Sequence, residues 1–128
     1  MRLMGLAWTK VYPQILRDAT RDVIAQQRPD GGWSQHADYS ADAYATGMSL
    51  FALHEAGMPV ADAQYRKGIA FLLKTQYESG AWLVKTRSIP SQAYFESGFP
   101  FGRNQWISAA GTSWASLAIA YTLPDAAR

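Results

Sequence analysis

The chain contains no cysteine among its 128 residues. This absence excludes disulfide bonds, thiolate catalysis and every zinc site that needs a cysteine ligand. A cysteine-free chain is compatible with a reducing compartment. We therefore expect a cytoplasmic protein and leave a peripheral association with a membrane open.

Net charge and long apolar runs are also scarce. The formal net charge is only +2, and the 12 lysines and arginines are scattered along the chain, so no electrostatic footprint for nucleic acid is visible. The longest apolar runs, such as residues 69–73, fall far short of the ~20 residues that cross a bilayer, and the start shows no secretory signal pattern. We expect no nucleic-acid partner, no membrane span and no export signal.

Hydrophobic residues make up 48% of the chain, which suits a single globular domain over residues 1–128. Helix signals recur and strand signals hardly appear. Pro13 suits a first helical turn, while Ser40 or Asp42 and then Asp62 can cap later helices. The expected helices cover residues 1–11, 13–27, about 42–57, about 62–77 and about 107–123. The sequence thus predicts an all-α fold.

One sequence word occurs twice. Gln-x-x-x-Gly-x-Trp stands at Gln27, Gly31 and Trp33 and again, 49 residues later, at Gln76, Gly80 and Trp82. A second word, beginning at Thr46, reappears 66 residues later at Thr112. Such periods are typical of repeat proteins. We predict two repeats, about residues 13–57 and 62–123, the second with a connector 17 residues longer than the first.

The duplicated turn has a sufficient structural explanation. Gly31 and Gly80 permit the backbone conformation that ends a helix, and the Gln27 and Gln76 amides can bond backbone groups at a neighbouring helix end. The indoles of Trp33 and Trp82 cover the turn and keep an N–H for a partner. We interpret all six side chains as structural.

The helices that open near the two threonines carry small residues along one face. These are Ala45, Ser49, Ala52 and Ala56 in one copy and Gly111, Ala115, Ala118 and Thr122 in the other. Small faces let helix axes approach closely, so these are predicted inner helices. The helix at 62–77 is more amphipathic, exposing Arg66, Lys67 and Lys74, and suits an outer layer.

The segment Lys-Gly-x-x-Phe-Leu-x-x-x-Gln-x-x-x-Gly-x-Trp at residues 67–82 resembles the QW motif of squalene-hopene and oxidosqualene cyclases. The Thr-x-x-Ala/Ser-x-x-Ala-Leu/Ile helices resemble inner helices of the same superfamily, which includes protein prenyltransferase β-subunits. The resemblance implies an open segment of an α/α toroid with four to five helices, outer and inner in alternation. It also implies an apolar, isoprenoid-type ligand and contact with preceding toroid repeats or self-association.

The catalytic elements of that superfamily are missing. The Asp-x-Asp-Asp acid of the cyclases does not occur, and Asp18 and Asp22 fit an exposed ion-pair network better than an acid pair. His36, Asp38 and His54 have no metal-ligand spacing. We expect no metal and no cofactor, and an isolated chain that is inactive. If the chain is part of an enzyme, the resemblance implies a terpene cyclase, an isomerase, or a prenyltransferase.

The long connector, residues 83–106, is the best sequence candidate for a ligand site, because long aromatic loops in compact domains are commonly functional. Its candidate binding residues are Arg87, Tyr94, Phe95, Glu96, Phe99, Phe101, Arg103 and Trp106. The alternative is that these aromatics only close the end of a helical wall.

Three functional interpretations remain open. The chain can be the C-terminal part of a triterpene-cyclase-like protein, to which it contributes apolar ligand surface. It can be a free-standing, non-catalytic binding or scaffold domain. By analogy alone, it can be a fragment of a glycan-processing α/α toroid.

Overall fold

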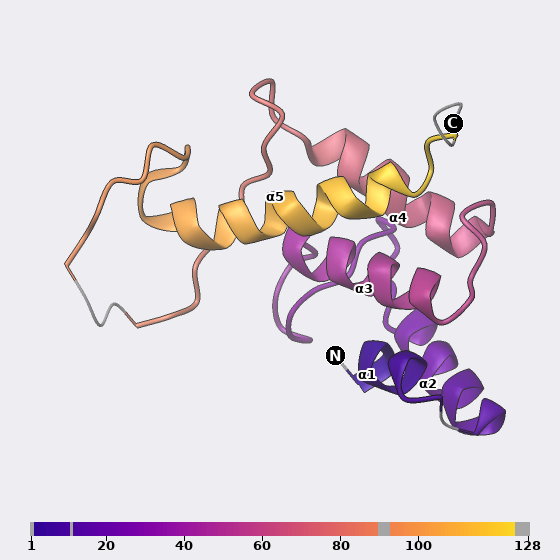
Figure 1. Ribbon diagram of the computed structural model, residues 1–128. Helices are drawn as coiled ribbons and strands as arrows, with labels where there is room; N and C mark the ends of the chain where they lie inside the picture. Colours follow the sequence, from indigo (N-terminus) through magenta and orange to yellow (C-terminus); the bar gives the residue numbers. More distant parts are fainter. Residues whose placement is uncertain (1, 11, 90–92, 125–128) are drawn as a thin grey trace.

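The structure is a computed structural model that describes residues 2–10, 12–89 and 93–124. Five α-helices follow one another in these ranges (Figure 1): α1 Arg2–Trp8, α2 Pro13–Ala25, α3 Ala43–Glu55, α4 Ala63–Thr75 and α5 Gln105–Ala120. A short 3-10 turn, Gly102–Asn104, leads into α5. The described ranges contain no strand, so the all-α prediction is confirmed. Met1 and Val11, the ends of the expected first helix, lie outside the described residues.

The helix starts follow the predicted caps. The Asp42 carboxylate accepts a hydrogen bond from the Ala45 N–H at 2.8 Å, and the Asp62 carboxylate accepts one from the Gln64 N–H at 2.8 Å. Such side-chain acceptors satisfy amide groups that have no partner within the helix. Proline occupies the first position of α2, as expected.

Several predicted boundaries were wrong by two or three residues. Helix α2 ends at Ala25 instead of residue 27, α3 at Glu55 instead of about 57, and α5 at Ala120 instead of about 123. Helix α4 ends at Thr75 instead of residue 77, because Gln76 has an extended backbone and already belongs to the following turn. Helix α5 begins at Gln105 instead of residue 107, since the 3-10 turn runs directly into it. Trp106 therefore lies on a helix and not in the connector.

Helices α1, α3 and α5 form a row in which α3 packs against both of its neighbours. Helix α2 lies against α1 and α3, and α4 lies against α3 and α5 (Figure 1). Each helix of the pair α2 and α4 thus spans two members of the row.

The contact between α3 and α5 is close because glycine stands where the two backbones meet. A methyl group added at Gly47 would lie 2.5 Å from the carbonyl carbon of Trp114. On α5, Ala115 and Ala118 are fully buried at this contact. Small residues on the facing helix surfaces therefore set the distance between the axes.

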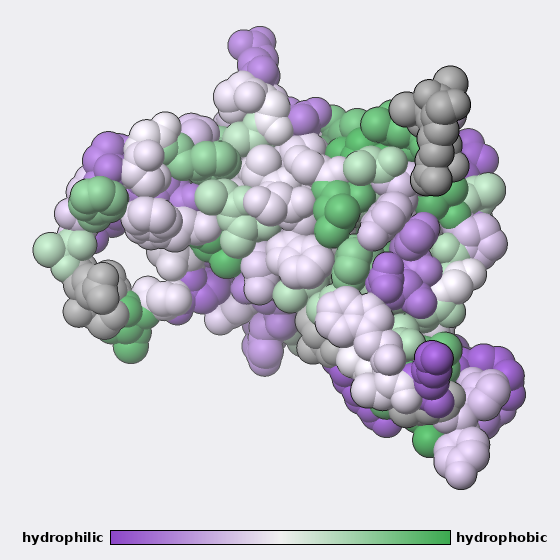
Figure 2. Space-filling view, viewed as in Figure 1, coloured by the Kyte–Doolittle hydropathy of each residue, from purple (hydrophilic) through white to green (hydrophobic). Residues whose placement is uncertain are grey.

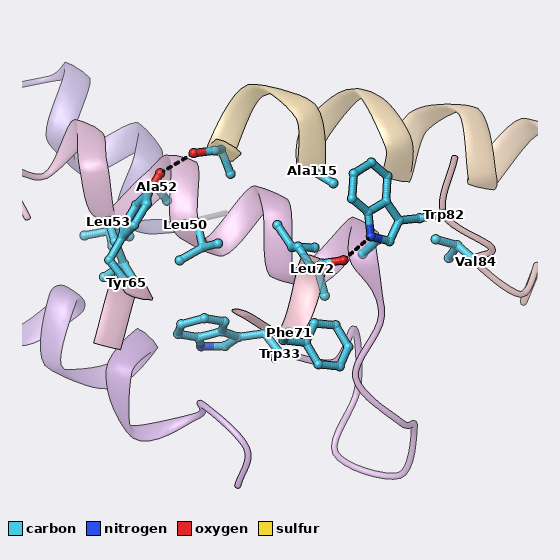
Figure 3. Close-up of a cluster of buried hydrophobic side chains, with 14 of the residues drawn as sticks. Trp33, Leu50, Ala52, Leu53, Tyr65, Phe71, Leu72, Trp82, Val84 and Ala115 are labelled. Atoms are coloured by element: carbon cyan, nitrogen blue, oxygen red, sulfur yellow. Dashed lines mark hydrogen bonds between the residues drawn. The ribbon is translucent and has the colours of Figure 1, made fainter. Parts of the chain in front are cut away.

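The apolar core lies between the row and α4 (Figure 3). Tyr65 of α4 is completely buried in it, and its hydroxyl donates to the Ala118 carbonyl of α5 at 2.9 Å. The largest other members are Trp33, Leu50, Leu53, Phe71, Leu72 and Trp82. A polar tip bonded to a helix carbonyl lets a large aromatic ring be buried here without an unpaired hydroxyl.

Stability at alkaline pH should depend on Tyr65. Burial raises the pKa of Tyr65 to about 12, from an ordinary value of 10.0. The unfolded chain therefore loses this proton before the folded chain does, so the stabilisation is complete below pH 10 and is lost as pH rises toward 12. The loss in free energy of unfolding should approach about 2.5 kcal/mol at the end of this window. Urea unfolding at pH 9 to 12 measures it, with Tyr65→Phe as the control that should lack this part of the pH dependence.

Candidate functional site

The two Gln-x-x-x-Gly-x-Trp turns, residues 27–33 and 76–82, are built alike. In the first turn the Gln27 Nε2 donates to the Gly31 carbonyl at 2.9 Å, and in the second the Gln76 Nε2 donates to the Gly80 carbonyl at 2.9 Å. Both glycines have positive φ angles, 92° and 85°, which few other residues adopt. Each glutamine thus closes its own turn.

The tryptophan of each turn joins two helices. The Trp33 backbone N–H donates to the Thr46 hydroxyl of α3 at 2.9 Å, and its indole N–H donates to the Val23 carbonyl of α2 at 2.7 Å. Trp82 repeats both bonds, to the Thr112 hydroxyl at 3.0 Å and to the Leu72 carbonyl at 2.7 Å (Figure 3). Both tryptophans are only 2% exposed. The two duplicated sequence words therefore meet in space, because each Trp binds the Thr of the following helix.

Only some of the connector candidates lie together. The Arg87 guanidinium lies 4.0 Å above the ring of Tyr39, while the Phe101 ring lies edge-on to Tyr77 at 5.0 Å. Phe95 stacks on Trp106, with centroids 6.2 Å apart. Arg87 and Phe101 thus lie against residues outside the connector, whereas Phe95 and Trp106 lie against each other.

Gln105 organises the part of the connector nearest α5. Its side chain is buried, its Oε1 accepts from the backbone N–H and the hydroxyl of Ser97, and its Nε2 donates to the Phe95 carbonyl at 2.7 Å. The sequence reasoning missed this role. An amide with both a donor and an acceptor directly before an aromatic residue was the available signal.

The acidic candidate of the connector is held ionised. The exposed Tyr94 hydroxyl donates to the Glu96 carboxylate at 2.5 Å, and this bond lowers the pKa of Glu96 and raises the pKa of Tyr94. A carboxyl group with a lowered pKa is a poor proton donor. Of the other two candidates, Phe99 is half-buried and Arg103 is exposed in the 3-10 turn.

A second aromatic group, which we call the aromatic cluster, forms where α1, α3 and α5 meet. Phe51 lies at its centre, with ring centroids 6.4 Å from Trp8, 5.3 Å from Trp114 and 6.1 Å from Tyr121. The Trp8 indole N–H donates to the Glu55 carboxylate at 2.9 Å. The cluster therefore joins residues from three helices that are far apart in the sequence.

The aromatic cluster lies to one side of the contact with α4. Leu50 faces α4, since a methyl group added at Gly68 would lie 2.7 Å from a Leu50 methyl. Phe51 follows Leu50 and is turned about 100° around the helix axis from it. Trp8 is 59% exposed, while Phe51 and Trp114 are half-buried. The surface over α3 and α5 carries pale and green patches accordingly (Figure 2).

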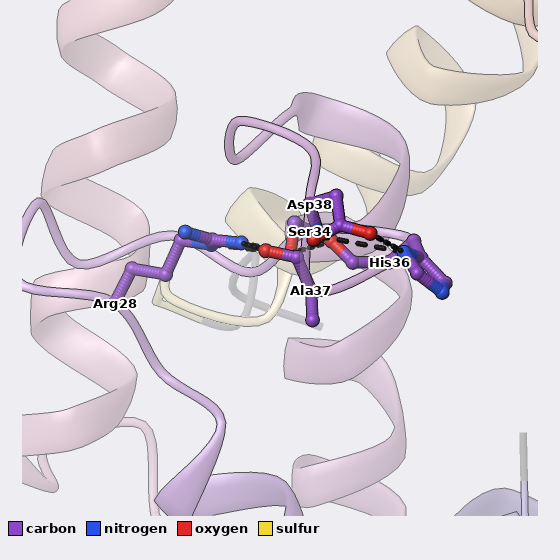
Figure 4. A network of polar contacts seen from close by, with 5 residues as sticks. All are labelled: Arg28, Ser34, His36, Ala37 and Asp38. Carbon is purple, nitrogen blue, oxygen red and sulfur yellow. Dashed lines mark hydrogen bonds and ion pairs between the residues drawn. The ribbon is translucent and has the colours of Figure 1, made fainter.

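The residues considered for a metal site make contacts of other kinds. The His36 Nδ1 lies 3.4 Å from the Asp38 carboxylate, beside the bonds from Arg28 to Ser34 and to the Ala37 carbonyl (Figure 4). His54 instead stacks on Tyr121 at 3.9 Å. Among the described residues, no three His, Asp or Glu side chains are grouped so that they could hold a metal ion.

The other acidic pair considered from the sequence is exposed on α2. The Asp18 carboxylate accepts from the Gln14 amide at 2.8 Å and lies 3.6 Å from the Arg21 guanidinium. These are surface contacts of a solvated helix face.

The chain matches no protein-family model and no solved structure. None of the helices in the described part of the chain combines the length and the apolar character that a membrane crossing requires. Any functional conclusion therefore depends on the geometry of the turns, the connector and the aromatic cluster.

Proposed function

We propose that the chain is a repeat module of the squalene cyclase and prenyltransferase type, which contributes an apolar ligand surface to a larger α/α assembly. The two turns at residues 27–33 and 76–82 serve as its structural joints. The aromatic cluster serves as its ligand surface. The single observation that carries this proposal is the convergence of aromatic rings from α1, α3 and α5 on one side of the row.

The chemistry of the aromatic cluster suits an isoprenoid-type ligand. Ring faces attract positive charge as well as apolar groups, so they stabilise both a polyene chain and a developing carbocation. Trp8 is well exposed, and Phe51 and Trp114 keep part of their surface open to solvent. A ligand can therefore reach the rings without unfolding the row.

The module is proposed as non-catalytic on its own. The sequence has no Asp-x-Asp-Asp acid. The connector carboxylate of Glu96 is kept ionised by Tyr94, which disfavours its use as the proton donor for an alkene. In this proposal the acid belongs to another part of the assembly.

Titration with geranylgeraniol, read by tryptophan fluorescence, tests the ligand surface. Trp8 and Trp106 make a matched pair, because both are 59% exposed but only Trp8 belongs to the aromatic cluster. We expect saturable binding, weakened about tenfold by Trp8→Leu and unchanged by Trp106→Leu, since loss of one aromatic contact to an apolar ligand corresponds to roughly 1.4 kcal/mol.

Three outcomes would contradict the proposal. Absence of saturable binding removes the ligand surface. An effect of Trp106→Leu without an effect of Trp8→Leu moves the site to the start of α5 and the connector residues beside it. A cyclised product after incubation with squalene shows that the chain has an acid of its own.

A further inference from the structure

The two turns differ in what covers them. Over the first turn lies α4: the Gln27 Nε2 makes a second bond, at 2.9 Å, to the Gln64 carbonyl in the first turn of α4. The contact is tight, since a methyl group added at Gly31 would lie 2.4 Å from the Lys67 carbonyl oxygen. Gly31 is accordingly buried. The first turn is therefore a docking site for the beginning of a helix, and we call such a site a seat.

The second turn has the same seat without a helix on it. Among the described residues, the Gln76 amide donates only to its own turn, at Gly80. Around a methyl group added at Gly80, the nearest atom is the Gln76 amide nitrogen, at 4.0 Å. Gly80 and Gln76 are exposed, unlike Gly31 and Gln27 in the first turn. One donor of Gln76 thus points to a place that a protein carbonyl fills in the first turn.

A groove runs along α4, the helix that leads into the second turn. It has a volume of about 420 Å³ and is lined by the α4 residues Arg66, Ile69, Ala70 and Leu73, with Val60, Ala61 and Thr122 at its sides. Leu73 is 57% exposed, whereas Ile24, which stands 49 residues earlier on α2, is half-buried. The apolar side chain at this repeat position is therefore more open beside the second turn than beside the first.

We propose that the second turn and this groove dock a further helix of the α4 kind, as α4 docks on the first turn. Its first helical turn supplies a backbone carbonyl to the Gln76 amide. Four residues after the one that supplies this carbonyl, the docking helix carries glycine or alanine, as Gly68 follows Gln64 in α4. The apolar side of the docking helix covers Leu73. This inference rests on the proposed repeat character of the chain and adds the chemistry of the partner.

The docking helix is not α2 of a second intact copy of the chain, because it must not be preceded by an inner helix such as α1. Helix α2 already packs on α1 in the way that α4 packs on α3. If α2 of a second copy took the seat, its α1 would fall on the position of α5. The docking helix therefore belongs to a following or ring-closing repeat, with α5 as its inner neighbour.

An extended chain tests this docking directly. The offset of 66 residues aligns Ala56 with Thr122, so a copy of residues 57–76 placed after Thr122 follows α5 as α4 follows α3. We expect the added helix to be protected from hydrogen exchange in the full extended chain. Gln76→Ala should lower that protection about fivefold, the effect of one lost hydrogen bond, beyond the smaller loss that breaking its exposed bond to Gly80 causes in the unextended chain.

Gly68→Leu in the added copy alone is the steric control. In the original α4, a methyl group at this position already comes 2.7 Å from Leu50 and 3.1 Å from Trp33. The larger side chain should therefore abolish protection of the added helix while the rest of the chain stays folded.

An added helix that exchanges freely in the parent sequence overturns the docking proposal, as does Gln76→Ala with equal effects in both chains. Failure of the repeat proposal itself is seen separately. Gln27→Ala in the unextended chain removes the bond to α4 at the first turn and should lower the folding equilibrium constant at least fivefold. This result does not depend on whether the added helix docks in the extended chain.

Discussion

Trp82→Ala should lower the free energy of unfolding by about 3 to 5 kcal/mol, the usual cost of deleting a large buried aromatic side chain. Trp82 is only 2% exposed, and its indole N–H holds the Leu72 carbonyl near the end of α4. The substitution thus opens a cavity and removes the indole hydrogen bond to this carbonyl. Urea denaturation monitored by circular dichroism measures the loss.

Trp106→Ala is the matched control, because it removes the same indole from a site that is 59% exposed. Its cost should stay below about 1 kcal/mol, in line with most exposed substitutions. Equal losses in the two variants would show that Trp82 does not hold the turn to α4 and would contradict its structural role.

Local sequence signals were enough for the helices and the turns. Asp42 and Asp62 cap the helices they were expected to cap, and Gly31 has the positive φ that its place in the motif requires. These features depend on residues within one or two helical turns of each other, where spacing and side-chain chemistry carry the information. The expected bond from Gln27 to a neighbouring helix is also present.

Contacts between distant segments were not visible in the sequence. Arg87 lies on Tyr39 and Phe101 lies on Tyr77, so two of the connector candidates have partners that precede them by many residues. No local pattern specifies such pairings, which depend on how the helices pack. The same reason explains why aromatic density in one segment does not show which of its rings lie together.

The aromatic cluster is a second case in which contacts between distant segments are not specified by local sequence. Phe51 and Trp114 lie on the two helices with small faces, and only packing reveals that they meet each other and Trp8. The cluster forms because glycine at position 47 brings α3 and α5 close enough for their aromatic edges to touch. The geometry of the aromatic cluster and the helix spacing are therefore coupled through one residue.

Gly47→Ala should destabilise the protein by about 3 kcal/mol, although alanine is the better helix former. In an exposed helix the exchange would gain about 1 kcal/mol. Here the new methyl group would lie 2.5 Å from the Trp114 carbonyl carbon and 2.6 Å from the Ala115 nitrogen. Because both obstacles are backbone atoms, no side-chain rotation relieves the overlap, and the cost of overpacking reaches about 4 kcal/mol.

Gly5→Ala on α1 is the control, because it changes helix propensity without any steric overlap. A methyl group at Gly5 meets no atom within 4 Å. It should stabilise the chain by up to about 1 kcal/mol. Thermal and urea unfolding of both variants give the comparison. If Gly47→Ala proved as stable as the parent, α3 and α5 could separate without loss. The aromatic cluster, whose rings meet only at the present spacing, would then have no fixed geometry with which to receive a ligand.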